Sequence, residues 1–432
     1  MKIRKYTGRA LLLLFWVLAG IGAVDTFIPR GSAHAGTVPV LYVDARGRTG
    51  AEVGTALGNL VKAEFPDIRQ KMDAYLAQFI GLIASVEGVS SREIFDGYAV
   101  PRINAIKPNI EQRYRNEVSA LGSRLGLSDT DALGDGGLSL NELWALQLIA
   151  DIGRETNCSG FGVFGDYASS GSPAVGRNLD WYSTSDLRSL QAVTVYVYEH
   201  RALVNIGFAG LAAVITGYNS DGLFGGILDS PMGNDYPDWP YGKRSYVFDL
   251  RNALESCTRI SDAVGLLYNQ PYAFSHNILF ADTTDVRVLE HPQGVSGQLR
   301  TAGSRLNPDL SWGKSKQIAV VNFFALPGYI NERSGYNLDR WNRFRELAGF
   351  SLYHKATIND LESIMLDTGS PYPIFNAQTV QSMVFTPADK KLYMYARGVH
   401  ASTAMEQIPV SGGTGADGSH QPLPFLFFLL ED

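Results

Sequence analysis

Apolar residues recur at three- and four-residue spacing through the first third of the chain, which predicts helices there. From residue 51 to Gly153 the pattern is almost wholly helical, as in IRQKMDAYLAQFIGLIASVEG. Near the end of this stretch, Ser139 with Glu142 three residues later predicts a capped helix start, and Gly153 is suited to end that helix. Residues 36–50 read as extended and polar.

After Cys158 the helical spacing gives way to alternation, which predicts β-strands. CSGFGVFG and SPAVGRNLDW flank the turn-rich DYASSGS and predict a β-hairpin, and QSMVFTP and KLYMYAR predict a later one. Further strands are expected at 191–200, 276–291 and 317–324. Helical spacing returns in three segments, at 246–268, 338–349 and 357–366. Because helices and strands come in separate runs, the pattern favours a layered α+β fold over a doubly wound parallel sheet.

The N-terminus has the pattern of an export signal. Basic residues from Lys2 to Arg9 precede the apolar run ALLLLFWVLAGIGAV, and Ala33 and Ala35 have the spacing of a cleavage site. We therefore expect residues 1–35 to be a signal peptide and the mature protein to be exported, to the periplasm or outside the cell. A membrane anchor fits less well, because a spanning helix needs about 20 apolar residues.

Composition and charge exclude several classes of function. Hydrophobic residues make up 45% of the chain, which is enough to build a sizeable core. The net charge of −6 provides no basic surface, so nucleic acid is not expected as a partner. The histidines lack metal-ligand spacing, and Leu133 stands where the calcium-loop-like segment 131–142 needs a ligand. No metal and no organic cofactor are expected.

The chain has two cysteines, Cys158 and Cys257. In an exported protein a disulfide between them is the ordinary expectation, and the sequence leaves it open. If Cys158 is a nucleophile, its thiol must stay unbonded, and Cys257 is then a small buried apolar residue.

Arg177 and Asp180, in GRNLDW, lie on the second arm of the hairpin that Cys158 begins. A guanidinium favours thiolate over thiol, and a carboxylate can hold an amine. Residues three apart on a straight strand face opposite ways. Both side chains therefore reach one thiol only if the chain bends at Asn178–Leu179. A surface Arg–Asp pair on a hairpin is the plain alternative.

A cysteine that opens a strand, followed about twenty residues later by GRNLDW, resembles the cysteine N-terminal-nucleophile (Ntn) amide hydrolases. These include penicillin V acylase, bile salt hydrolase, acid ceramidase, N-acylethanolamine acid amidase and the isopenicillin N acyltransferase group. NSDGLFGGILDSP, HNILFADTTDVRVLEH, VVNFF and DRWNRFREL also resemble segments of this family, and LSLNELWALQLIADI resembles the ceramidase-like pro-segment. The resemblance implies a four-layer αββα sandwich over 158–432, preceded by a helical pro-segment at 36–157.

The resemblance also implies a chemistry. The precursor would cut itself between Asn157 and Cys158, which would then carry both a thiol nucleophile and an α-amine base. Arg177 would lie beside the thiolate, Asp180 would hold the amine, and Asn322 would donate to the oxyanion. The positions that match the family's catalytic residues are Cys158, Arg177, Asp180, Asp229, Asn322 and Arg340. Arg343, one helical turn later, is an alternative to Arg340.

The chain departs from the family's pattern in two places. Ser159 stands where the family commonly has threonine, and Asp229 stands where the bile salt hydrolases have asparagine. An aromatic-rich insertion, PMGNDYPDWPYGKRSY, follows Asp229. Its aromatic residues either line an acyl pocket or pack the loop onto the body of the protein. These residues are Tyr236, Trp239 and Tyr241.

The function expected from these features is hydrolysis of a non-peptide N-acyl amide bond in a small molecule. An acyltransferase that uses the same acyl-enzyme is one alternative, and an exported binding protein on an inactive Ntn scaffold is another. A Cys–His–Asn site that includes His276 and Asn277 fits less well, because the sequence around Cys158 lacks the papain-type signature. Whether the pro-segment stays bound after cleavage is left open.

Overall fold

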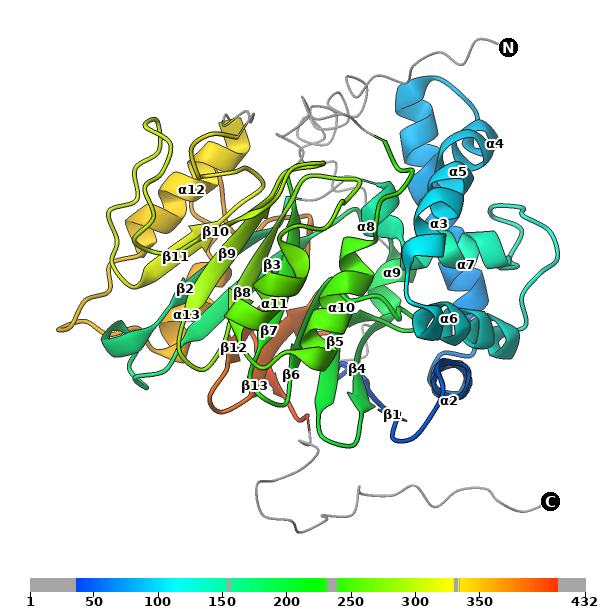
Figure 1. Ribbon diagram of the computed structural model, residues 1–432, viewed down its shortest axis with the longest axis horizontal. Coiled ribbons are helices and arrows are strands. Elements are labelled where there is room, and N and C mark those ends of the chain that lie inside the picture. The colour runs from blue at the N-terminus through cyan, green and yellow to red at the C-terminus, as the bar shows by residue number, and fades with distance from the viewer. Residues whose placement is uncertain (1–35, 154–156, 231–238, 330–332, 334, 411–432) are drawn as a thin grey trace.

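The computed structural model describes residues 36–153, 157–230, 239–329, 333 and 335–410 (Figure 1). The expected signal peptide at 1–35 and Tyr236 lie outside the described residues.

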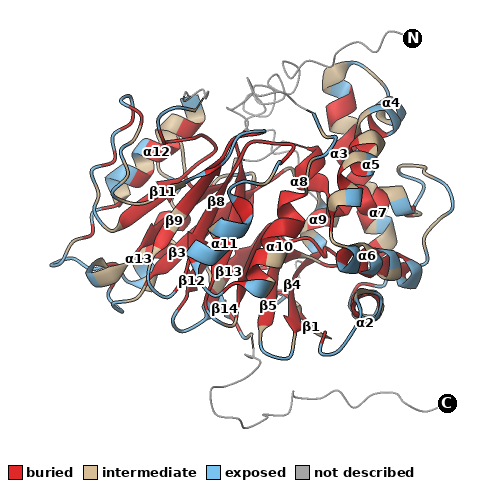
Figure 2. Cartoon of the chain, in the orientation of Figure 1, coloured by how far each residue is buried: buried red, intermediate tan, exposed pale blue. Residues whose placement is uncertain are grey.

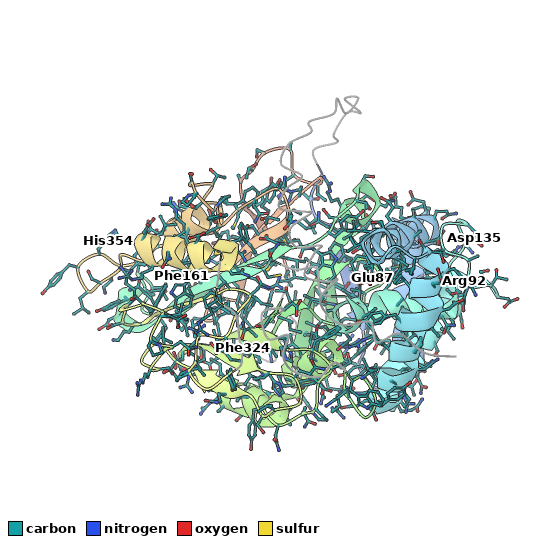
Figure 3. All side chains as sticks on the ribbon, turned by 90° about the horizontal axis from the view of Figure 1, so that it is seen from above. Glu87, Arg92, Asp135, Phe161, Phe324 and His354 are labelled. Atoms are coloured by element: carbon teal, nitrogen blue, oxygen red, sulfur yellow. The ribbon has the colours of Figure 1, made fainter. Side chains whose placement is uncertain are left out.

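The N-terminal segment is helical, as its spacing predicted. Its elements are β1 (Val40–Asp44), α2 (Gly50–Glu64), α3 (Ile68–Glu87), α4 (Ser91–Ile94), α5 (Val100–Ile106), α6 (Gln112–Leu125), α7 (Leu140–Gln147) and α8 (Ile149–Ile152). The capping box expected at Ser139 and Glu142 is present at the start of α7, and Gly153 follows α8. Seen from above, Glu87, Arg92 and Asp135 of this segment lie at the opposite end of the molecule from His354 (Figure 3).

Among the described residues, the strands form two sheets. The larger has the order β1, β4 (Gln191–Val197), β5 (Ala202–Phe208), β6 (Thr216–Asn219), β7 (Phe224–Asp229), β8 (His276–Ala281), β9 (Val286–His291), β10 (Gln298–Arg300). The smaller has the order β11 (Gln317–Val320), β2 (Ser159–Val163), β3 (Ala174–Asp180), β12 (Thr379–Thr386), β13 (Lys391–Ala396), β14 (Glu406–Ile408). The two expected hairpins are β2–β3 and β12–β13.

The two sheets pack face to face. The ring centroids of Tyr218 in one sheet and Phe385 in the other are 4.2 Å apart. Glycines in β2 allow this close approach, because a Cβ atom built on Gly160 or Gly162 would lie 2.5 Å from a side chain of the larger sheet. The spaced glycines of CSGFGVFG thus serve sheet packing.

Helices cover the sheets from outside (Figures 1 and 2). The helices outside the N-terminal segment are α9 (Ser185–Ser189), α10 (Tyr246–Ser256), α11 (Ile260–Leu267), α12 (Gly335–Leu347) and α13 (Ile358–Met365). Helix α10 contacts β6 and β7 of the larger sheet, whereas α13 contacts β3 and β12 of the smaller one. Phe161 of β2 lies beneath α12, with its ring 6.0 Å from that of Phe344 (Figure 3). The expected mixed α+β fold is confirmed.

One expectation is wrong and another is incomplete. The single helix expected at 246–268 is wrong. Helix α10 ends at Ser256, and the next residue, Cys257, has an extended backbone and accepts a hydrogen bond on its carbonyl from the Asn219 side chain at 2.8 Å. Residues 36–50, expected only to be extended, contain strand β1, which pairs in parallel with β4 and continues the larger sheet.

No single helix among the described residues has the length and hydropathy to cross a membrane. Ile68–Glu87 and Ser91–Asn109 pass that test only as a pair, which is bent by 98°.

Candidate active site

The β2–β3 hairpin brings Cys158 and Arg177 together. Gly160 of β2 pairs with Arg177, so Cys158 precedes the paired region directly and its side chain is 1% exposed. The Arg177 Nη2 atom donates to Cys158 Sγ at 3.6 Å, and the thiol donates to the backbone carbonyl of Asp180 at 3.7 Å. No disulfide joins Cys158 to Cys257. The thiol and the guanidinium expected beside it are therefore adjacent.

Arg177 is fully buried between the two sheets. Its Nη2 atom also donates to the backbone carbonyl of Ile227 in β7, and Gly226 leaves room for it, since a Cβ there would lie 2.5 Å from Arg177 Cδ. Burial lowers the pKa of Arg177, whereas the Cys158 and Asp180 charges raise it. A buried cation at this distance favours the thiolate form of Cys158.

Strand β3 continues through Asn178–Leu179 to Asp180, and its pairing with β12 shifts register there, between Thr379 and Gln381. The backbone carbonyl of Asp180 accepts the hydrogen bond from the Cys158 thiol, and the Asp180 carboxylate contacts other residues. The Oδ2 atom accepts a hydrogen bond from the Asn376 side chain at 2.8 Å and lies 3.4 Å from Arg340 Nη1. Burial raises the pKa of Asp180, and the Arg340 charge opposes that rise.

The peptide between Asn157 and Cys158 is held from several sides. The Asn157 backbone N–H donates to the Asp180 carbonyl at 3.4 Å, and its side chain donates to Gln378 Oε1 at 2.8 Å. Arg340 Nη1 donates to the Asn157 carbonyl oxygen. A guanidinium is thus bound to the carbonyl group that the resemblance marks for cleavage.

The structure places Arg340, not Arg343, at this site. Arg340 is fully buried, and its Nη2 atom donates to Asn322 Oδ1 at 3.0 Å and to Asn337 Oδ1 at 2.6 Å. Arg343 lies one turn further along α12 and forms an ion pair with Asp367 at 2.6 Å. Of the two arginines that the sequence left open, Arg340 is therefore the one that contacts the site.

Asn322 and Asp229 complete the arrangement. The Asn322 side chain donates to the Asp229 backbone carbonyl at 2.7 Å. Asp229 ends β7 opposite His276 of β8 and lines a small cavity together with Cys158. A chain of hydrogen bonds therefore links Asp229, Asn322, Arg340 and the Asn157 carbonyl.

Trp239 and Tyr241 are the two candidate aromatic residues of the insertion that lie within the described residues. The side chains of Trp239 and Tyr241 contact each other at 4.9 Å and are 61% and 56% exposed. Neither lines the small cavity beside Cys158 or the apolar pocket next to it. Tyr236 lies outside the described residues.

Sequence reasoning missed Asn376 and Gln378, whose side chains contact Asp180 and Asn157 respectively. Both lie in a short loop before β12 and belong to no motif, so no signal in the sequence could have identified them. Tyr336 of α12, whose ring lies 4.5 Å from the Arg340 guanidinium, also belongs to no motif.

The His276–Asn277 pair has other contacts. The His276 ring stacks on Tyr246 at 4.4 Å, and the Asn277 side chain donates to the backbone carbonyls of Val321 and Phe323. Asn277 thereby fixes the backbone on both sides of Asn322. Across the described ranges, no group of three or more His, Cys, Asp or Glu side chains is arranged to hold a metal ion.

Asp151, at the end of α8, is a buried acid close to the site. Ser245 Oγ donates to its carboxylate at 2.5 Å, and the backbone N–H of Tyr246, which lines the Cys158 cavity, donates at 3.4 Å. Burial raises the pKa of Asp151 to about 7, and these hydrogen bonds oppose that rise. The carboxyl group therefore becomes charged near neutral pH, inside the protein.

This ionisation is expected to make the folded protein less stable as pH rises. Between the ordinary pKa of 3.8 and about 7, the folded state binds more protons at Asp151 than the unfolded state does, so the free energy of unfolding falls with rising pH. Across this whole pH range, Asp151 lowers the free energy of unfolding by on the order of 4 kcal/mol.

Urea unfolding of an Asp151→Asn variant tests this expectation. Its free energy of unfolding should fall less steeply than that of wild type between about pH 5 and pH 7.5. Asp389→Asn, in an exposed turn, is the matched control, and equal slopes in Asp151→Asn and wild type would contradict the assignment.

No family model and no curated protein matches the chain. Among solved structures, an N-acylethanolamine-hydrolyzing acid amidase ortholog from Caenorhabditis elegans is 18% identical, with 54% of this chain and 96% of that chain covered and a TM-score of 0.41. A conjugated bile acid hydrolase from Clostridium perfringens is 13% identical, with 58% and 92% covered and a TM-score of 0.36. Penicillin V acylase from Agrobacterium tumefaciens is 12% identical, with 56% and 83% covered and a TM-score of 0.32.

These TM-scores lie below 0.5, so the similarity carries no argument about activity. The three enzymes are nevertheless of the kinds that the sequence motifs named. The chain is thus similar, by its motifs and among solved structures, to members of the cysteine Ntn-hydrolase family.

Proposed function

We propose that this protein is a self-processing cysteine amidase that hydrolyses N-acyl amides through a thioester on Cys158. One observation carries the proposal: Arg340 donates to the Asn157 carbonyl, and the next residue is a buried thiol beside Arg177. A nucleophile and a cationic donor thus stand at a single peptide bond. Packing of α10 and α13 on opposite sides of the paired sheets supports an αββα catalytic domain over 158–432.

Self-cleavage in this proposal is an acyl shift followed by hydrolysis. Cys158 Sγ attacks the Asn157 carbonyl carbon, and Arg340 stabilises the negative charge that develops on the oxygen. The C–N bond breaks, the Cys158 nitrogen takes up the proton lost by the thiol, and a thioester remains. Water then cleaves the thioester, which leaves a carboxylate on Asn157 and restores the thiol.

Amide hydrolysis repeats this chemistry on a substrate. The thiolate of Cys158 attacks the substrate carbonyl, and the amine departs with a proton. The α-amine of Cys158, with an ordinary pKa of about 7.7–8.0, can accept a proton from the water that hydrolyses the acyl-enzyme. The Asp180 backbone carbonyl, which accepts from the Cys158 thiol at 3.7 Å, would accept a hydrogen bond from this amine in its protonated form. Asn322 and Arg340 donate to the oxyanion.

We further propose that residues 1–35 direct export and that the segment 36–157 stays bound after cleavage. Two features support retention of the segment. Strand β1 pairs along β4, and Arg251 of α10 forms buried ion pairs with Glu117 of α6 at 2.8 Å and with Glu255 at 2.7 Å. Cleavage at Asn157 breaks neither set of contacts.

The test is to produce residues 36–432, separate the products on a denaturing gel and sequence their N-termini. We expect a fragment that begins Cys-Ser-Gly-Phe-Gly in the wild-type protein and an intact chain in Cys158→Ala. The processed protein should release a carboxylic acid and an amine from N-acyl amides. A wild-type chain that stays intact from acid to neutral pH would refute the proposed mechanism.

A further inference from the structure

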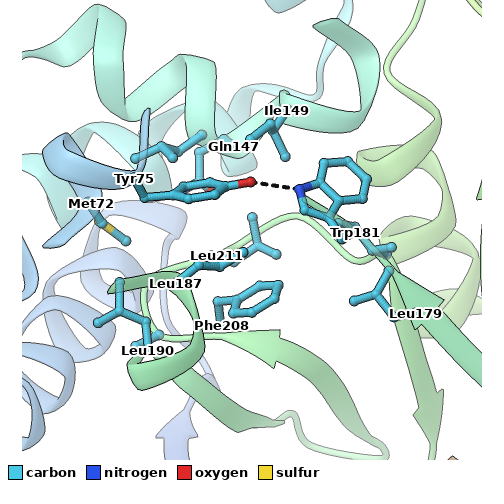
Figure 4. Close-up of a pocket in the computed structure, with 13 residues that line it drawn as sticks. Met72, Tyr75, Gln147, Ile149, Leu179, Trp181, Leu187, Leu190, Phe208 and Leu211 are labelled. Carbon is cyan, nitrogen blue, oxygen red and sulfur yellow. Dashed lines mark hydrogen bonds between the residues drawn. The ribbon is translucent and has the colours of Figure 1, made fainter. Parts of the chain in front are cut away.

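A cavity lies where the chain passes from β10 to β11, the strands at which the two sheets end on one side. Its volume is about 480 Å³, within the range of small-molecule sites. The residues that line this edge cavity fall between Arg300 and Ile318, so no candidate catalytic residue borders it. The apolar pocket beside the Cys158 cavity, which Tyr75 and Trp181 border, holds only about 40 Å³ (Figure 4). The edge cavity is thus a separate and roomier site.

Hydrogen bonds hold the walls of the edge cavity. The Asn307 side chain donates to the Leu326 carbonyl at 2.8 Å, and Trp312 Nε1 donates to the Gln317 carbonyl at 2.9 Å. These bonds tie the loop between β10 and β11 to the body of the protein on both sides. The cavity is therefore formed before any ligand arrives, which lowers the entropic cost of binding.

The edge cavity has an excess of positive charge. Among the described residues that line it, two are cationic, Arg300 and Lys314, and none is acidic. The charge of Arg300 is balanced by Glu290, which accepts from Arg300 Nε at 2.6 Å. Asp309 of the same loop pairs with Arg333 at 2.8 Å. Lys314 is half-buried and forms no ion pair with a described residue, so one positive charge in the cavity remains unbalanced.

Arg300 also has a donor that the protein does not use. The side chain is 2% exposed and lines the cavity. Its Nε atom donates to Glu290, and its Nη2 atom donates to the Ala319 carbonyl at 2.8 Å. Its Nη1 atom makes no hydrogen bond within the part of the chain that the structure describes. An oxygen atom of a ligand can therefore accept a charge-assisted hydrogen bond there.

Apolar side chains complete the lining. They come from the loop and from β11, and they are Leu306, Leu310, Trp312 and Ile318. Leu310 and Trp312 are both 7% exposed, and the Trp312 N–H is already bonded to protein, so these side chains present mainly carbon. One unbalanced charge suits a monoanion, and the apolar lining suits a ligand with a hydrocarbon body.

We propose that the edge cavity binds a small monocarboxylate with an aromatic or aliphatic body. Lys314 and Arg300 hold the carboxylate, and Leu310 and Trp312 contact the body. The site goes beyond the proposed amidase function and does not depend on it, because its residues are all outside the candidate active site.

The experiment is isothermal titration calorimetry of protein spanning residues 36–432. The probe is 4-phenylbutyrate, and two relatives each lack one of its features: 4-phenylbutanol has no charge, and acetate has no apolar body. We expect 4-phenylbutyrate to bind about tenfold more tightly than either, the usual effect of one hydrogen bond to a charged group. Lys314→Met should weaken 4-phenylbutyrate about tenfold and leave 4-phenylbutanol unchanged, and Lys314→Arg should retain most of the affinity.

Lys355→Met is the matched control, because Lys355 is an exposed lysine that does not line the cavity. Its affinity for 4-phenylbutyrate should equal that of wild type. Absence of 4-phenylbutyrate binding, or binding that Lys314→Met leaves unchanged, would overturn the inference. Equal affinities for 4-phenylbutyrate and 4-phenylbutanol would also overturn it, since the carboxylate would then contribute nothing.

Discussion

Replacing Arg340 with leucine should slow self-cleavage by about a hundred- to a thousandfold, so that the intact chain accumulates. Losing one preorganised donor to a developing oxyanion typically costs this much in rate. Arg340 donates to the Asn157 carbonyl and also forms an ion pair with the buried Asp180 carboxylate. The measurement is the fraction of cut chain over time on a denaturing gel, and Arg340→Lys should recover part of the rate.

Arg343→Leu is the matched control, because it removes the same side chain one turn along the same helix. Arg343 pairs with Asp367 at a partly exposed position, so its loss should leave the cleavage rate unchanged. Circular dichroism of each variant shows whether the fold is retained. A folded Arg340→Leu protein that is cut at the wild-type rate would remove Arg340 from the mechanism.

Replacing Arg251 with leucine should lower the free energy of unfolding by about 3–5 kcal/mol, the usual cost of breaking a buried ion pair from one side. Its guanidinium lies 4.6 Å from the Tyr114 ring and 4.3 Å from the Tyr196 ring, between the carboxylates of Glu117 and Glu255. Without it, the buried Glu117 carboxylate loses its ion pair, and Glu255 keeps only the one with Arg113 at 2.7 Å. Urea unfolding in a Cys158→Ala background compares chains of the same covalent structure.

In processed protein, the same change should allow the two fragments to separate. We expect residues 36–157 to co-elute with the larger fragment in wild type and to dissociate from it in Arg251→Leu. Arg287→Leu breaks the partly exposed Arg287–Asp285 pair and should cost no more than about 1 kcal/mol. Equal losses in the two variants would mean that the Arg251 network does not hold the segment.

The Cys158 hairpin could be predicted because its signals are local. Alternation on both sides of DYASSGS specifies the pairing, and pairing places Arg177 beside Cys158. The direction of the Asp180 side chain could not be predicted in this way. Its partners Arg340 and Asn376 are 160 and 196 residues away in the chain.

Long-range pairing explains the other differences as well. Nothing in VLYVD indicates that β1 joins β4, more than a hundred residues later. The break between α10 and α11 could not be predicted either, because the apolar spacing continues across it. The contact made there, from the Asn219 side chain to the Cys257 carbonyl, comes from a distant part of the chain. The helical segment, by contrast, was predictable, since its caps and its period are encoded within each helix.

The position of β1 has a consequence for solubility. In the structure β4 is flanked by β1 and β5, so its backbone N–H and C=O groups are paired on both sides. A protein that began at Cys158 would lack β1 and leave a valine-rich strand, QAVTVYV, as an open edge. Such an edge is a template for pairing with other chains and for aggregation. The segment before Cys158 therefore also acts as a built-in guard against self-association, and it should be co-produced whenever the catalytic part is made.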